Sequence, residues 1–300
     1  MSEHIPIFCA TDENYAPFAS LMMKSVLIHT SSFIDFYIMN NGLLSKTKKL
    51  IQKDLKKYPN KKLHFVDMTE YDLSQFPEIS HFSTNTFSRY FIPKIAPNLT
   101  KIIYLDVDII VVGDISELYK QDLENHPLAA VPEDYLDGSK IQLKNQIWPL
   151  YKSSSSYFNA GVLLLDIPKL IQLHFTENAV NLTAQLYHKL SCADQDILNI
   201  LFEDTYKKLD YRFNIPASRE VFLYKKHPDV KNEKPIILHY SSNIKPWKHK
   251  LDNSSTYFDD TLRESVFYKP VIKKYRAKKK SKYYLFGFIP LFTHVTLKKQ

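Results

Sequence analysis

The residues at 101–112, KIIYLDVDIIVV, most constrain the fold because they set two carboxylates inside an otherwise apolar, β-branched run. A continuous apolar run of this kind predicts a strand that is buried on both faces of a parallel sheet. Asp106 and Asp108 are two positions apart, so on such a strand their side chains point to the same side. Val107 then lies on the opposite face of the sheet.

The paired carboxylates predict a metal site. Two like charges at the end of a buried strand are unfavourable unless a cation lies between them, and a divalent metal prefers such hard oxygen ligands. The alternative is that Asp106 ends the strand and Asp108 caps a turn, with neither binding anything. The continuation of the apolar run through residues 109–112 argues against a turn. Because metals commonly clamp diphosphates, the pair also suggests a phosphate-bearing substrate.

Glycine is scarce, which limits how a nucleotide could be bound. The 300 residues are 44% hydrophobic and can bury a large core as one domain, or as one domain with an appendage. Only 5 glycines are present, and neither GxGxxG nor GxxxxGK[ST] occurs, so a bound nucleotide must be held by metal and side chains. Cys9 and Cys192 lie far apart without metal-ligand spacing, and we expect both to be reduced.

The net charge of +8 is confined to the C-terminal end of the sequence. Residues 269–300 contain ten Lys or Arg and no Asp or Glu, while the remaining residues carry a net charge of −2. A nucleic-acid-binding protein would spread basic residues over its fold, so we expect no nucleic-acid partner. The basic run precedes the apolar segment LFGFIPLF at 285–292, and together they predict a peripheral anchor on an anionic membrane surface. The alternative is a disordered basic tail.

The beginning of the sequence, MSEHIPIF, lacks a basic region followed by an apolar stretch, so we expect no signal peptide. No run of roughly 18 apolar residues occurs, and we expect no membrane-spanning segment.

The order of apolar segments predicts an α/β fold with a mixed, mostly parallel sheet. Besides the central run, strands are expected at 5–10, 35–40, 63–68, 128–132, 158–165, 211–215 and 236–240. Helices are expected at 15–29, 45–58, 83–95 and 175–190, and again after Asp194. Such sheets bind ligands at the carboxyl ends of their strands. The polar, irregular residues 137–156 are a candidate lid or acceptor-binding loop.

Several polar residues near these strand ends have both a structural and a functional interpretation. Asp12 and Asn14 could start a helix or recognise a base and ribose. Arg89 could snorkel beside its aromatic neighbours, or reach a diphosphate or the carboxylate pair. Asp194 could cap a helix, or line a sugar pocket with Gln195.

The residues around 159–161 and His239 complete the candidate site. The small residues of Asn159-Ala160-Gly161 would let the backbone approach a bound sugar closely. A lone strand histidine is usually a satisfied core residue, but beside a carboxylate pair His239 is better explained as a third metal ligand.

Five motifs occur in order: ATDENY at 10–15, YLDVDIIV at 104–111, YFNAGVLLLD at 157–166, ADQDILN at 193–199 and HYSSNIKPW at 239–247. With these motifs the sequence resembles the retaining glycosyltransferases of family 8, over roughly residues 5–250. That family has a nucleotide-sugar-binding α/β domain of the GT-A type. The bacterial galactosyl- and glucosyltransferases that build lipopolysaccharide or lipooligosaccharide are the most similar in pattern. The family usually has glycine where this chain has Ser242.

The resemblance implies a residue for each part of the reaction. Asp106, Asp108 and His239 would be ligands of Mn²⁺ (or Mg²⁺), and Lys245 would neutralise the departing diphosphate. Asp194, Gln195 and Lys245 would be the catalytic residues. The implied donor-binding residues are Ala10, Thr11, Asp12, Asn14, Arg89, Asp106, Val107, Asp108, Asn159, Ala160 and Lys245, with Asp12 and Asn14 on the uridine.

The resemblance also implies a function and a location. It predicts metal-dependent transfer of galactose or glucose from a UDP-sugar to a lipopolysaccharide, lipooligosaccharide or related glycan acceptor, with an α linkage. We expect a catalytic domain at 1–268 and a membrane-associating tail at 269–300, on the cytoplasmic face of the inner membrane. The alternatives are a protein or soluble acceptor, and a catalytically impaired nucleotide-sugar-binding protein.

Overall fold

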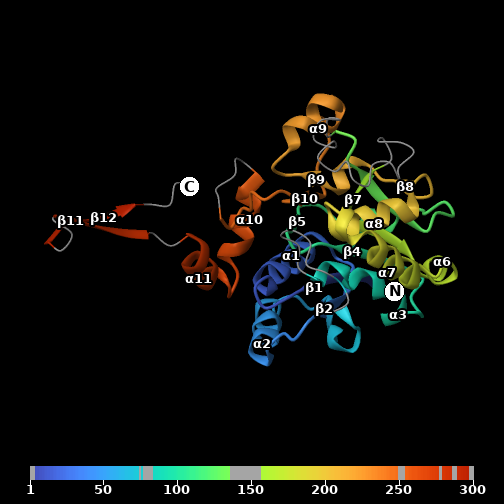
Figure 1. The fold of residues 1–300 in the computed structure, drawn as a ribbon, viewed down its shortest axis with the longest axis horizontal. Coiled ribbons are helices and arrows are strands. Elements are labelled where there is room, and N and C mark those ends of the chain that lie inside the picture. The colour runs from blue at the N-terminus through green and yellow to red at the C-terminus, as the bar shows by residue number, and fades with distance from the viewer. Residues whose placement is uncertain are drawn as a thin grey trace.

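The computed structural model describes residues 4–73, 76, 84–135, 157–248, 254–276, 279–285 and 289–296. Its main sheet has seven strands in the order β3-β2-β1-β4-β7-β6-β8 (Figure 1). These strands are β1 (His4–Thr11), β2 (Phe33–Asn40), β3 (Lys61–Asp67), β4 (Lys101–Leu105), β6 (Leu128–Pro132), β7 (Phe158–Asp166) and β8 (Lys207–Lys208). Strand β7 runs antiparallel to both of its neighbours, and the other four pairings are parallel. The predicted α/β fold with a mixed, mostly parallel sheet is therefore confirmed.

Helices cover both faces of this sheet, which explains why its strands read as continuous apolar runs. The helices of the described residues are α1 (Ala16–His29), α2 (Ser45–Asp54), α3 (Ile92–Ile95), α4 (Ser116–Tyr119), α6 (Ile167–Gln172), α7 (Phe175–Leu186), α8 (Ala193–Phe202), α9 (Glu220–Lys226), α10 (Ser254–Arg263) and α11 (Tyr268–Val271). Short 3₁₀ segments are η1 (Met68–Glu70), η3 (Thr84–Phe91), η7 (Tyr187–Lys189), η8 (Tyr211–Phe213) and η9 (Pro228–Asn232), and a π-helical turn spans Ile272–Arg276.

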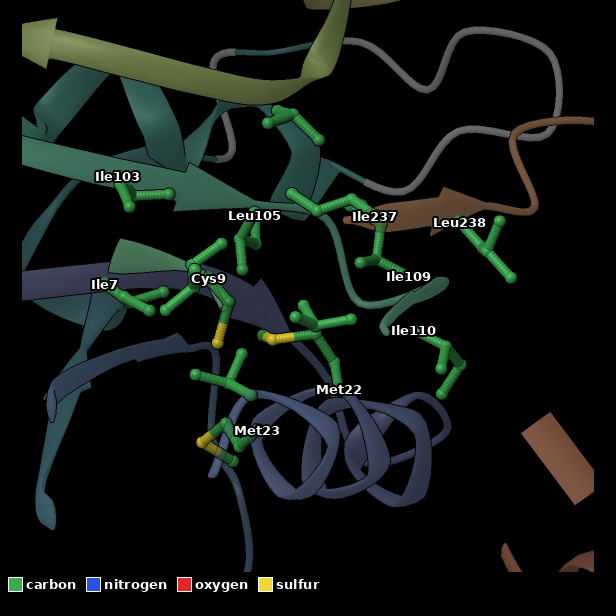
Figure 2. Close-up of a cluster of buried hydrophobic side chains, with 14 of the residues drawn as sticks. Ile7, Cys9, Met22, Met23, Ile103, Leu105, Ile109, Ile110, Ile237 and Leu238 are labelled. Carbon is green, nitrogen blue, oxygen red and sulfur yellow. The ribbon is translucent and has the colours of Figure 1, made fainter. Parts of the chain in front are cut away.

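Alternate residues of the strands enter two different cores. On one face Ile7, Cys9 and Leu105 pack with Met22 and Met23 of α1 (Figure 2). On the other face Phe8 and Tyr104 belong to a cluster with residues of η3, α6, α7 and α8. Fixing β1 and β4 from both sides holds their carboxyl ends at one place, and the candidate site lies there.

The expectation of one continuous strand over 101–112 is wrong. Strand β4 ends at Leu105, a turn follows at Val107 and Asp108, and β5 (Ile109–Val111) joins a separate sheet. That sheet has the order β5-β10-β9, with β9 (Ile215–Pro216) and β10 (Ile237–His239), and β10 runs antiparallel to β5. Both halves of the run are buried, so the composition stays apolar while the hydrogen-bonding partner changes. The expected strand at 211–215 is likewise divided, into η8 and β9.

Two sequence expectations fall on parts of the chain that the structure does not fully describe. The candidate lid at 137–156 lies outside the described residues. Within the proposed tail, β11 (Lys279–Leu285) and β12 (Ile289–Thr296) pair antiparallel with each other. No helix among the described residues has the length and hydropathy to cross a membrane.

A buried ion pair joins the start of the chain to its C-terminal helices. Lys24 of α1 donates to Asp54 of α2 at 2.8 Å, and both side chains are 1% exposed. The Lys24 ammonium also donates to the carbonyl of Glu264 at 2.9 Å. The Asp54 carboxylate accepts from the Ser265 hydroxyl and the Val266 amide, each at 2.9 Å. One charge pair therefore ties α1 and α2 to the segment that follows α10.

Replacing Lys24 with methionine should lower the free energy of unfolding by about 3–5 kcal/mol, because the carboxylate of Asp54 would stay buried without a counter-charge. Urea denaturation measures this. The control is Lys57→Met, since the Lys57–Glu264 pair spans 2.8 Å between side chains that are each 58% exposed. An exposed pair contributes about 0–1 kcal/mol. Similar losses in the two variants would contradict the role assigned to the buried pair.

Candidate functional site

A pocket of about 380 Å³ opens where β1 and β4 end and β7 begins. Its volume is in the range that holds a small molecule. It brings together nearly all of the residues selected from the sequence: Ala10, Thr11, Asp12, Arg89, Asp106, Val107, Asp108, Asn159, Ala160, Asp194, Gln195, His239 and Lys245. Asn14 does not line the pocket; it is exposed beside it and accepts a hydrogen bond from Lys274 at 3.0 Å.

Asp106, Asp108 and His239 form a cluster that could hold a metal ion. One ligand atom of each lies within 4.8 Å of the others. Nε2 of His239 is 3.2 Å from Oδ1 of Asp108 and 3.9 Å from Oδ2 of Asp106. Two carboxylates and one imidazole suit Mn²⁺, and two oxygen donors suit Mg²⁺. The turn between β4 and β5 supplies both aspartates, and antiparallel pairing of β10 with β5 brings the histidine to them.

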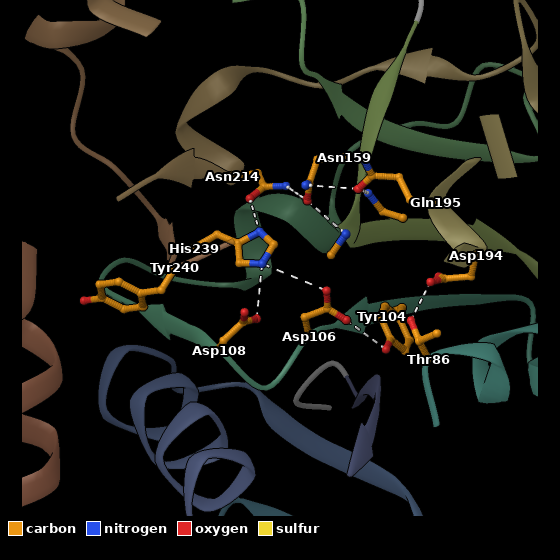
Figure 3. A network of polar contacts seen from close by, with 12 residues as sticks. Thr86, Tyr104, Asp106, Asp108, Asn159, Asp194, Gln195, Asn214, His239 and Tyr240 are labelled. Carbon is orange, nitrogen blue, oxygen red and sulfur yellow. Dashed lines mark hydrogen bonds and ion pairs between the residues drawn. The ribbon is translucent and has the colours of Figure 1, made fainter. Parts of the chain in front are cut away.

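A relay of side-chain amides fixes the tautomer of His239 (Figure 3). The backbone N–H of Gly161 can only donate, and it donates to Oδ1 of Asn159 at 2.9 Å. That oxygen also accepts from Nδ2 of Asn214 at 2.9 Å, so the other side-chain atom of Asn214 is an acceptor. Nδ1 of His239 therefore carries the proton and donates to Oδ1 of Asn214 at 3.0 Å. The lone pair of Nε2 is left facing the carboxylates, as a metal ligand requires.

Gly161 has a role that the sequence did not suggest. A Cβ at this position would lie 2.3 Å from Cε1 of His239 and 2.8 Å from Oδ2 of Asp106. The absence of a side chain therefore makes room for two of the candidate metal ligands. The close approach of a sugar to this backbone stays a prediction. This cradle supports a metal site that a bulkier residue would close.

Arg89 is a buried cation between two carboxylates. Its Nε lies 2.7 Å from Oδ2 of Asp194, and its Nη2 lies 2.9 Å from Oδ1 of Asp106. Burial alone would lower the pKa of Arg89, but the neighbouring carboxylates outweigh this effect and hold the pKa above its usual value. The guanidinium carbon is also 4.2 Å from the centre of the Tyr104 ring. Arg89 therefore reaches Asp106 of the carboxylate pair, and a contact between Arg89 and a diphosphate stays a prediction.

Asp194 does not cap helix α8. The backbone N–H groups of Ser191 and Cys192 donate instead to Asp196, each at 2.7 Å. The Asp194 carboxylate turns into the pocket, where Thr86 donates to it and Arg89 pairs with it. Burial raises the pKa of Asp194 to about 6, against the opposing effects of Arg89 and Thr86.

Gln195 is held by a set of hydrogen bonds that includes a residue the sequence did not reveal. Its Nε2 donates to Glu133 at 3.2 Å and to the hydroxyl of Tyr157 at 3.0 Å, while its Oε1 accepts from the amide of Ala160 at 3.0 Å. Glu133 is buried and lines the pocket. Its place as the first residue after β6 was the available signal, because ligands bind beyond strand ends in such sheets.

Other pocket residues were missed because little in the sequence marks them. Thr86, Tyr104 and Arg219 line the cavity, and Asn214 orients the histidine from behind it. A hydroxyl, a phenol or an amide carries no signature of its own. Their roles depend on partners far away in the sequence.

Lys245 and Ser242 lie on a loop after β10. Nζ of Lys245 donates to Oδ2 of Asp108 at 2.5 Å and to the carbonyl of Tyr240 at 2.6 Å. Burial opposes ionisation of Asp108, but the ammonium of Lys245 outweighs it and holds the pKa of Asp108 well below the usual range. Ser242 has a negative φ, and its hydroxyl accepts from Ser218 at 2.6 Å and from the amide of Ile244 at 3.2 Å. Serine is therefore accommodated here without the backbone freedom of glycine.

The known proteins that this chain is similar to include several glycosyltransferases. The family model for glycosyl transferase family 8 matches residues 6–250. The chain is 28% identical over 259 residues to the glycosyltransferase GlyF of Streptococcus pneumoniae, covering 86% of this chain and 59% of that protein. It is 25% identical over 310 residues to the lipopolysaccharide 1,2-glucosyltransferase of Escherichia coli, covering 96% and 89%.

The fold matches that of a solved structure. The galactosyltransferase LgtC, in complex with donor and acceptor sugar analogues, superposes with a TM-score of 0.72 at 24% identity, covering 86% of this chain and 95% of that one. Several relatives are much longer than the region that matches this chain. The chain spans between 30% and 59% of the length of five streptococcal glycosyltransferases.

Replacing Gly161 with alanine should weaken Mn²⁺ binding by about tenfold or more, because the added Cβ displaces His239 or Asp106. Calorimetric titration of Mn²⁺ in the presence of UDP measures this. Gly113→Ala is the matched control, since its Cβ would crowd Ile236 at 3.1 Å and no residue of the site. Unchanged Mn²⁺ affinity in a folded Gly161→Ala variant would refute the assignment of the cluster.

Proposed function

The chain belongs to glycosyl transferase family 8, and on that premise we propose that it is a retaining, metal-dependent hexosyltransferase. It moves galactose or glucose from a UDP-sugar to a glycan acceptor and forms an α linkage. One observation carries the proposal: the Asp106–Asp108–His239 cluster lies in a pocket of ligand size, with Lys245 at its edge. A divalent cation with an adjacent lysine is the arrangement that a leaving diphosphate needs.

The donor site divides into a metal side and a nucleotide side. Asp106, Asp108 and His239 would hold Mn²⁺ or Mg²⁺, which supplies Lewis-acid stabilisation of the leaving diphosphate. Lys245 adds positive charge at the same edge of the pocket and is held there by Asp108 and by a backbone carbonyl. Asp12, at the carboxyl end of β1, has side-chain oxygens with which it would bind the uridine.

The contacts of Asp194 and Gln195 favour attack on the same face from which UDP departs. Asp194 is buried, accepts from Thr86 and pairs with Arg89, so its charge is already engaged. Gln195 has a neutral amide that holds neighbouring groups in place. In this route the anomeric C–O bond to phosphate breaks, the acceptor oxygen bonds to the anomeric carbon, and the acceptor proton passes to the leaving phosphate. A covalent sugar trapped on Asp194 would overturn it.

We propose lipopolysaccharide, lipooligosaccharide or a related glycolipid as acceptor. The name of the Escherichia coli relative supports this choice, as does the basic and apolar composition of residues 269–300. That tail would hold the enzyme on the cytoplasmic face of the inner membrane, with residues 1–268 as the catalytic domain. A protein or soluble acceptor is the second candidate. A binding protein without activity is disfavoured by the complete set of Asp106, Asp108, His239 and Lys245.

Incubation with a panel of UDP-sugars should show slow release of UDP from one of them, and chelation of divalent metal should abolish it. Asp108→Asn should lower that rate by about two orders of magnitude or more, because it removes a ligand charge from the cluster. Asp114→Asn is the matched control: this aspartate follows β5, and its side chain accepts from the amide of Ser116 at 2.9 Å. If no UDP-sugar is turned over, even with added glycolipid, and UDP with Mn²⁺ does not bind, the proposed function is wrong.

A chain ending at residue 276 should no longer sediment with vesicles that contain phosphatidylglycerol, whereas the full chain should. The deleted residues include six lysines and the apolar segment 285–292, and an anionic surface attracts both features. High salt should release part of the full chain, and neutral phosphatidylcholine vesicles should bind less of it. Equal sedimentation of the two chains would contradict a membrane role for the tail.

A further inference from the structure

The loop that carries Lys245 rests on residues from the beginning of the proposed tail. We call residues 241–248 the lysine loop. The guanidinium of Arg276 donates to the carbonyl of Pro246, the residue directly after Lys245. The same guanidinium pairs with Asp259 of α10 at 2.8 Å, and the two side chains are 23% and 17% exposed. Arg276 therefore joins the lysine loop to α10 through a partly buried charge.

Aromatic packing reinforces this support. Trp247, in the lysine loop, is 1% exposed and stacks on Phe18 of α1 with ring centres 3.8 Å apart. Tyr275 packs against the same phenylalanine at 5.8 Å, and Phe258 of α10 lies 5.9 Å from Trp247. Tyr275, the residue before Arg276, therefore belongs to the same aromatic cluster as Trp247 of the lysine loop.

The segment also touches the other side of the nucleotide site. Lys274 donates to Asn14 at 3.0 Å, in the connection between β1 and α1. Asp12, in the same connection, lines the pocket and accepts from the backbone N–H of Tyr15 at 2.8 Å. Residues 274–276 therefore contact both loops that border the proposed UDP site.

We propose that Arg276 is a positioning residue for the donor site, and that residues 269–276 are a working part of the catalytic domain, although their composition assigns them to the tail. Arg276 holds the carbonyl of Pro246, and this fixes the backbone from which Lys245 reaches Asp108. The role in nucleotide binding rests on the proposed function. The role in holding the lysine loop rests on the contacts alone.

The experiment compares chains ending at 268 and 276 with Arg276→Ala in the full chain. Loss of a charged hydrogen bond corresponds to about tenfold in affinity. The chain ending at 276 should bind UDP with Mn²⁺ within about twofold of the full chain, because all contacts of Arg276 remain. The chain ending at 268 and Arg276→Ala should each bind about tenfold more weakly. Arg276→Lys should fall between, since lysine keeps the charge for Asp259 without the guanidinium fork.

Arg263→Ala is the matched control. This arginine also pairs with an aspartate of α10, Asp260, at 2.8 Å, but the two side chains are 66% and 60% exposed. Among the described residues no hydrogen bond or ion pair joins Arg263 to the lysine loop, so the affinity for UDP should be unchanged.

Trp247 gives a readout that needs no nucleotide. In a Trp148→Phe background it is the one remaining tryptophan of the sequence. Its emission should shift to longer wavelength, and acrylamide should quench it more strongly, in Arg276→Ala and in the chain ending at 268, but not in the chain ending at 276. Unchanged quenching in the chain ending at 268 would overturn the proposal. If the full chain binds no UDP, the proposed function fails while the tryptophan signal still decides the role of Arg276.

Discussion

The change of sheet at residues 106–108 is the constraint on which the candidate site depends. The amide of Asp106 donates to the carbonyl of Gly161 at 2.8 Å, which keeps it with β7 of the main sheet. The carbonyl of Asp108 accepts from the amide of Tyr240 at 3.0 Å, which places it with the small sheet. The two carboxylates thus belong to different hydrogen-bonded layers and converge at their junction. His239 reaches the same point because its strand pairs with β5.

Charge balance explains the placing of the cations around this junction. Asp106 and Asp194 share Arg89, and Asp108 has Lys245. Buried carboxylates without such partners would be protonated or would destabilise the fold. Each of these three aspartates therefore has a cationic partner that belongs to the chain itself. A nucleotide-sugar donor would bring its own negative charge to the same place.

Much of the fold could be predicted because apolar periodicity reports burial directly. The apolar periodicity of the sequence could not locate the turn at Val107–Asp108, because a turn between two buried strands leaves the apolar pattern intact. Asp12 was recognisable because it directly follows the first expected strand, and Lys245 because the motif HYSSNIKPW resembles the family pattern. Asn214 was not, because its importance lies in the direction of its hydrogen bonds to Asn159 and His239.

That directionality limits how the site can change over evolutionary time. Aspartate has almost the shape of asparagine, yet at position 214 it would present an oxygen where a donor now meets Asn159. Reversing Asn159 to compensate would set its amide nitrogen against the N–H of Gly161, which is part of the backbone and has no alternative state. Substitutions of Asn159, Asn214 and His239 are therefore epistatic. None of these side chains can exchange its donor and acceptor atoms alone, and the N–H of Gly161 determines which combinations are viable.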